Sequence, residues 1–182
     1  MHPQDVIAHV SEGVDVLADK LASMASLGGP PRLDGTSLTV PFIKEDLPLV
    51  DHALGTSLVL PNGQTLGQVH RVPLLGQARV RRELVLSLDV TNFDSQPPTA
   101  ELLLPDGSPL PPGDWPKSIA GEGIVPNHKD YNRPFFCRRG LREYHSHPQH
   151  EDNPWDKYRE TLALHQIVIE LLHDLQNTWI GR

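Results

Sequence analysis

The sequence predicts an α+β fold in which helices near the two ends of the chain flank an antiparallel sheet. Apolar residues recur every three or four positions in both end segments, which is typical of amphipathic helices. Between them, several short runs alternate apolar and polar residues, as strands with one buried face do. Because these runs follow one another without intervening helices, we expect a single domain over residues 1–182 with helices and sheet segregated.

The first helix is expected over residues 4–27, within a first segment 1–28. It carries one apolar stripe, formed by Val6, Val10, Val14, Leu17, Leu21 and Met24. The sequence Gly-Gly-Pro-Pro at 28–31 should end this helix, because proline lacks an amide donor and glycine readily leaves helical geometry.

A β-meander is expected over residues 36–104. The candidate strands are 37–43, 56–60, 65–73, 78–90 and 99–104, with Pro-Asn-Gly at 61–63 as a tight turn. In the fourth run, Leu84, Leu86, Leu88 and Val90 alternate with residues of mixed polarity. That alternation predicts a sheet with one face on the core.

A long loop is expected over residues 105–154, where proline, glycine, aspartate and asparagine are frequent. Long irregular stretches inside compact domains are usually functional. The last segment, 155–180, should hold a C-terminal helix at about 157–179, because Leu164, Val168, Leu171 and Leu175 share one helical face.

Composition bears on partners and compartment. The formal net charge of -7 argues against a surface built for a phosphate backbone, so we expect no nucleic-acid partner. No apolar stretch is long enough for a membrane span, and the first residues lack the order of a signal peptide. A single cysteine cannot form an internal disulfide, so we expect a reducing, cytoplasmic environment.

The run FFCRRGLREYHSHPQH contains the candidate site. It brings Cys137, Glu143, His145 and His147 within eleven residues of one another. If 143–147 is extended, Glu143 and the two histidines point to one face, with Tyr144 and Ser146 opposite, and Gly140 could fold Cys137 onto that face. Thiolate, imidazole and carboxylate are zinc ligands, and Glu143, His150 or water could complete a tetrahedron. Glu143 is also a candidate general base, and the site could be structural or catalytic.

Two other interpretations of Cys137 stay open. It could be a nucleophile that carries an acyl group as a thioester, with Arg138, Arg139 or a protonated histidine lowering the pKa of its thiol. An oxyanion donor would then come from Asn127, His128 or Asn132 in the preceding loop. Alternatively, Cys137 is a small buried residue and the histidines belong to a solvated loop.

The order of elements and several landmarks resemble ubiquitin-conjugating enzymes. The run LVLSLDVTNFDSQPPTAELLL resembles that family's sheet strand and paired proline, and FFC followed by NPWDKYRETLALHQIVIELLHDL resembles its cysteine, tryptophan-proline region and following helix. The resemblance implies a UBC-like fold in which Cys137 stands where the thioester cysteine would be.

A closer similarity is to the predicted metal-binding family named for its Cys-Glu-His-His pattern (CEHH), found among bacterial ubiquitin-like conjugation operons. Cys137, Glu143, His145 and His147 reproduce that pattern in order. The resemblance implies a zinc-type site, with a ubiquitin-like protein and its activating enzyme as partners. We therefore expect a metal-binding component of such a pathway, with a Cys137-dependent transferase, a metal-dependent hydrolase and a non-catalytic adaptor as alternatives.

Overall fold

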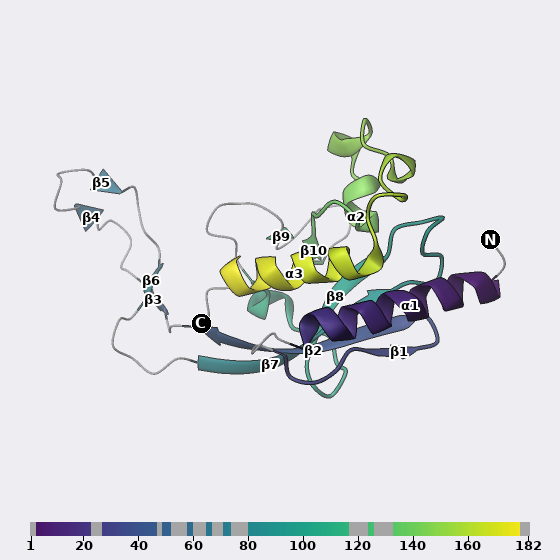
Figure 1. The fold of residues 1–182 in the computed structure, drawn as a ribbon. Helices are drawn as coiled ribbons and strands as arrows, with labels where there is room; N and C mark the ends of the chain where they lie inside the picture. Colours follow the sequence, from purple (N-terminus) through teal and green to yellow (C-terminus); the bar gives the residue numbers. More distant parts are fainter. Residues whose placement is uncertain are drawn as a thin grey trace.

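The computed structural model describes residues 3–22, 27–46, 49–51, 58–59, 65–66, 71–73, 80–116, 124–125 and 133–178. A helix comes first, antiparallel strands and a series of short elements follow, and a second long helix comes last (Figure 1). This arrangement confirms the α+β class. The finer UBC-like assignment stays a prediction.

The main sheet is a four-stranded antiparallel meander. Its strands, in spatial and chain order, are β1 (Arg32–Asp34), β2 (Ser37–Asp46), β7 (Val80–Asp89) and β8 (Thr99–Leu103). Strands β2 and β7 pair along their full ten-residue lengths. The predicted strands at 37–43, 78–90 and 99–104 are therefore confirmed, whereas β1 was not predicted.

The two other predicted strands do not join this sheet. Within the described residues, β3 (Leu49–Asp51) pairs with β6 (Arg71–Pro73), and β4 (Leu58–Val59) pairs with β5 (Thr65–Leu66). The prediction of one continuous meander was wrong here. Strand β2 pairs directly with β7, and the strands between them in the chain form two separate two-stranded sheets. The predicted turn at 61–63 lies outside the described residues.

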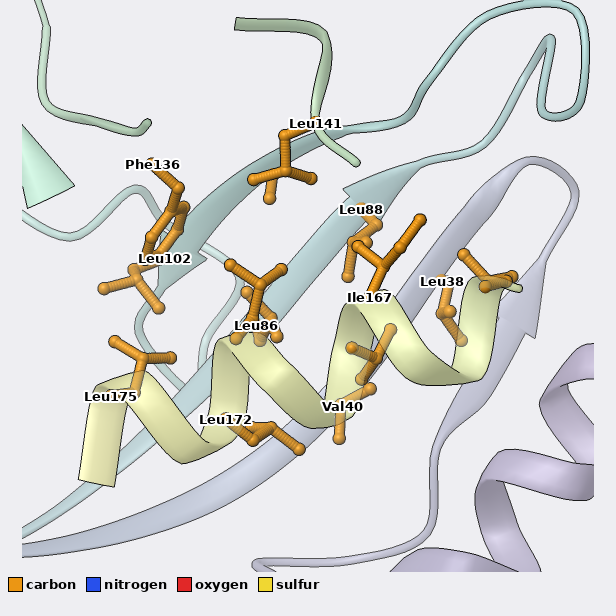
Figure 2. Close-up of a cluster of buried hydrophobic side chains, with 14 of the residues drawn as sticks. Leu38, Val40, Leu86, Leu88, Leu102, Phe136, Leu141, Ile167, Leu172 and Leu175 are labelled. Atoms are coloured by element: carbon orange, nitrogen blue, oxygen red, sulfur yellow. The ribbon is translucent and has the colours of Figure 1, made fainter. Parts of the chain in front are cut away.

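Two long helices, α1 (Pro3–Leu21) and α3 (Leu164–Thr178), contact each other and cover the sheet (Figure 1). Figure 2 shows side chains of α3 meeting those of the strands. Leu84, Leu86, Leu88 and Val90 are all buried, as the alternation in β7 predicts. The core thus lies between the helices and one face of the sheet. No helix among the described residues has the length and hydropathy that a bilayer span needs.

Both predicted helices were too long. Leu27 forms a β-bridge with Phe42, and the Gly28 amide donates to the Pro41 carbonyl at 3.0 Å, so the expected helix 4–27 cannot extend to its predicted end. Helix α3 begins at Leu164 instead of 157. There the Gln166 side chain accepts a hydrogen bond from the Ala163 amide at 2.9 Å, which caps the new helix start.

The predicted loop 105–154 contains short elements. Those described are the 3-10 helices η1 (Pro112–Asp114) and η2 (Pro148–His150), the paired strands β9 (Ile124–Val125) and β10 (Phe135–Phe136), and the single-turn helix α2 (Arg142–His145); η3 (Trp155–Lys157) follows. The candidate site lies from the end of β10 to η2.

Candidate functional site

Cys137 follows β10, where the chain leaves the hydrophobic core. The preceding Phe135 and Phe136 are buried, and the Phe136 ring lies 5.2 Å from the ring of Trp115. Cys137 itself is half-buried, and this burial raises the pKa of its thiol. The sulfur is therefore held at the boundary between core and solvent, mainly in the neutral thiol form at neutral pH.

The two arginines after the cysteine have other partners. Arg138 forms ion pairs with Glu170 at 3.6 Å and Asp174 at 3.0 Å, both on α3. The guanidinium of Arg139 lies 4.9 Å from the ring centre of Tyr158. Burial alone accounts for the direction of the thiol pKa shift, so the predicted role of these arginines in raising the thiolate fraction finds no support.

The condition of an extended 143–147 is not met, because Arg142–His145 form one helical turn, α2. The Leu141 carbonyl accepts hydrogen bonds from the amides of Tyr144 at 3.1 Å and His145 at 3.3 Å. The Arg142 amide donates to the Pro98 carbonyl at 2.9 Å, which attaches α2 to the start of β8. Helical geometry rotates successive side chains by about 100°, so Glu143 and His145 do not share the face that a strand would give them.

Glu143 is buried away from the cysteine, with 3% of its surface exposed. Its Oε1 forms an ion pair with Arg133 at 3.2 Å, while its Oε2 has no hydrogen-bond partner among the described residues. Burial raises the pKa of this carboxyl, with a further contribution from Glu101, while a backbone hydrogen bond, Arg133 and Arg142 oppose the rise. The contacts make Glu143 a buried framework residue, and none of them joins it to the cysteine or a histidine.

Glu143→Gln tests this assignment through the pH dependence of stability. The pKa of Glu143 is higher in the folded than in the unfolded protein, so ionising this carboxyl lowers the free energy of unfolding. Its contribution to that free energy is fully present below the unfolded pKa of about 4.3 and is lost as pH rises through the folded pKa. Urea unfolding at pH 4, 6 and 8 should therefore show the variant gaining stability relative to wild type as pH rises. A constant difference across these three pH values would contradict the assignment.

Both ring nitrogens of His145 are engaged by the backbone. Its Nε2 accepts a hydrogen bond from the Gly140 amide at 3.2 Å, and its Nδ1 donates to the Asn153 carbonyl at 2.7 Å. These partners assign the proton to Nδ1. Burial, together with His150 and Arg139, lowers the pKa of this imidazole against the opposing effect of the Asn153 hydrogen bond. His145 thus joins the turn after Cys137 to the chain after η2, and neither nitrogen is available to a metal in this arrangement.

His150 is the residue that the structure brings to Cys137. Its Nε2 lies 3.6 Å from the Cys137 Sγ. The imidazole stacks on the ring of Tyr144, with centroids 3.9 Å apart and an interplanar angle of 15°. Burial, followed by the charge of His147, lowers the pKa of His150. The Cys137 thiol and a neutral His150 imidazole therefore face each other.

His147 lies beside this pair. Its Nδ1 accepts a hydrogen bond from the Gln149 amide at 3.2 Å and so caps η2. The ring centres of His147 and His150 are 5.6 Å apart. The next turn is anchored by Trp155, a buried residue whose indole donates to the Asp94 carbonyl at 2.9 Å. These contacts fix the two ends of the segment 147–155, which carries His150.

The predicted site residues therefore separate into two groups. Cys137 lies with His150, which was predicted only as an alternative fourth ligand, and His147 is adjacent; Glu143 and His145 are engaged elsewhere. Tyr144, predicted to point away from the site, stacks on His150. Pro148, which favours a helical start after His147, is the one sequence signal for the turn that brings His150 back. Asn127, His128 and Asn132 lie outside the described residues.

The described residues contain no group of three or more histidine, cysteine, aspartate or glutamate side chains already arranged to hold a metal ion. No protein-family model matches the chain, and no curated protein is significantly similar to it.

Proposed function

We propose that Cys137 and His150 are two ligands of a zinc-type metal site, and that the chain is a metal-binding, UBC-like component of a bacterial ubiquitin-like conjugation pathway. The observation that carries the metal assignment is the separation of 3.6 Å between Cys137 Sγ and His150 Nε2. Zinc bonds of about 2.3 Å to sulfur and 2.0–2.1 Å to nitrogen place two tetrahedral ligand atoms about 3.6 Å apart. The pair therefore has the spacing that two ligands of one zinc ion require.

The ligand set differs from the one that the sequence pattern suggests. Glu143 does not fit, since it pairs with Arg133 in a buried position. His145 does not fit either, since both nitrogens bind the backbone. We therefore propose that Glu143 and His145, two members of the Cys-Glu-His-His pattern, support the site and do not bind the metal.

His147 is the candidate third ligand. An imidazole ring centre lies roughly 3 Å from a zinc ion bound to its nitrogen, so ring centres 5.6 Å apart are close to the spacing of two imidazoles on one ion, and His147 would join the site only after its side chain turns. Coordination through Nδ1 would exchange its hydrogen bond with the Gln149 amide for a metal bond. With two or three protein ligands, a bound zinc ion would supply a Lewis-acidic position open to solvent or to a partner group.

The pathway assignment is supported by the resemblance to ubiquitin-conjugating enzymes and the CEHH family, together with the order of helix, meander, cysteine and helix. It makes a ubiquitin-like protein and its activating enzyme the proposed partners. A transferase that carries its cargo on Cys137 is the second candidate, because the same thiol–imidazole contact would place a base beside a nucleophile. Burial raises the thiol pKa, so in either role the thiol has to lose its proton, to the neighbouring base or on binding the metal.

The test is the metal content of untagged protein purified without chelator from zinc-replete cells. Wild type should contain about one zinc ion per chain, and Cys137→Ser and His150→Ala should each lose it. His173→Ala is the matched control, because His173 is exposed on α3, and this variant should retain the metal. Metal-free wild type would overturn the proposal. A reductant-sensitive adduct on Cys137, formed with activating enzyme, nucleotide and ubiquitin-like protein, would then favour the transferase, and partner binding that survives Cys137→Ser would favour the adaptor.

A further inference from the structure

The orientation of the His150 ring depends on a neighbouring aromatic side chain. The His150 backbone is held in successive turns: its amide donates to the His147 carbonyl at 2.8 Å, and its carbonyl accepts from the Asn153 amide at 2.8 Å. These bonds place the Cα atom but leave the imidazole free to rotate about its side-chain bonds. The ring plane therefore has to be set by what the imidazole packs against.

Tyr144 provides that surface. The two rings are nearly parallel, with an angle of 15° and a centroid separation of 3.9 Å. The imidazole is attached through Cγ, so its plane turns by rotation about the Cβ–Cγ bond, and stacking on Tyr144 restricts that rotation. The edge that faces Cys137 carries Nε2.

Tyr144 is placed both through its ring, which lies edge-on to the His145 ring with centroids 5.1 Å apart, and through its backbone. Its amide donates to the Leu141 carbonyl at 3.1 Å, and its carbonyl accepts from the His147 amide at 3.2 Å. Leu141 is fully buried and belongs to the cluster of core side chains drawn in Figure 2. A chain of contacts therefore runs from the core through α2 and the Tyr144 ring to His150, and from there to the sulfur.

We propose that Tyr144 is a positioning residue, which holds the His150 imidazole with Nε2 facing Cys137 and so prepares the pair for a metal ion. This inference rests on the proposed zinc site for its functional meaning, but its geometric content applies to the metal-free protein as well. Residues that orient metal ligands without touching the metal typically change metal affinity by 10–100-fold when they are replaced.

Tyr144→Leu and Tyr144→Phe test the inference as a matched pair. Leucine keeps apolar bulk but removes the flat surface, whereas phenylalanine keeps the ring and removes only the hydroxyl. Zinc titration against a competing chelator should show a dissociation constant raised roughly tenfold or more in the leucine variant and within about twofold of wild type in the phenylalanine variant. Equal affinity in the leucine variant and wild type would overturn the proposal, as would equal losses in both variants.

A second readout needs no metal. In chelator-treated protein, nuclear Overhauser contacts between the Cys137 β protons and the His150 ring protons should be present in wild type and Tyr144→Phe and lost in Tyr144→Leu. Their persistence in the leucine variant would overturn the positioning role even where zinc binds. If wild type binds no zinc, the proposed metal site fails, and these contacts still decide whether Tyr144 positions His150.

Discussion

Gly140→Ala is expected to destabilise the folded protein by about 2–4 kcal/mol, because the substitution adds both backbone strain and a steric clash. Gly140 has φ +94°, a conformation that residues with a Cβ atom rarely adopt. An added Cβ would lie 2.9 Å from Ile167 Cγ1 and 3.2 Å from its Cδ1. Ile167 is 2% exposed and packs in the core, so it cannot yield toward solvent. Urea unfolding followed by circular dichroism measures the loss.

Gly107→Ala is the matched control for this variant. Gly107 also has positive φ, +84°, but a Cβ there would meet no atom within 4 Å. It should therefore show only the conformational cost, about 1 kcal/mol. Equal losses at the two glycines would contradict the close approach of the cysteine-bearing turn to α3.

His145→Ala is expected to cost about 2–4 kcal/mol, since it removes the partner of one buried amide and of one carbonyl at once. The Gly140 amide and the Asn153 carbonyl would each lose the ring nitrogen that now binds them. The aromatic packing of His145 would be lost as well, because its ring lies edge-on to Trp155 with centroids 5.5 Å apart. Thermal or urea unfolding measures the loss.

The decisive condition for His145→Ala is the presence of a chelator. A framework residue stabilises the metal-free protein, so the full loss should appear after zinc is removed. A ligand stabilises the fold only through the bound ion. If the variant and wild type unfold together in chelator and differ only in zinc, His145 is a ligand, and the framework assignment is wrong. His173→Ala, on the exposed face of α3, should have the same effect with and without zinc.

The long elements could be predicted because their periodicity reflects burial over many residues. Leu17 and Leu21 mark the buried stripe of α1, and the alternating apolar residues of β7 all face the core. The ends were less predictable. Helix α1 ends before Leu27 because that residue pairs with Phe42, a tertiary contact that no local pattern reveals.

The candidate site was only partly predictable, since a single helical turn decides it. The sequence Glu-Tyr-His-Ser-His alternates in a way that suits a strand, yet α2 forms because Leu141 is buried and Arg142 binds the Pro98 carbonyl, a contact of remote residues. That turn directs His145 to the backbone and Tyr144 to His150. Cys137 could be chosen as a candidate from its residue type and neighbours. Its partner, His150, could not, because the contact depends on the path of the turns between them.

We propose that one zinc ion is bound through the sulfur of Cys137 and the imidazole of His150. Zinc K-edge X-ray absorption of the metal-loaded protein tests it most directly, because the chain has one cysteine and a thiolate ligand from within it must be Cys137. We expect one sulfur scatterer at about 2.3 Å, together with imidazole scattering that decreases in His150→Ala. A first shell of nitrogen and oxygen alone, or a spectrum unchanged by His150→Ala, would contradict the claim.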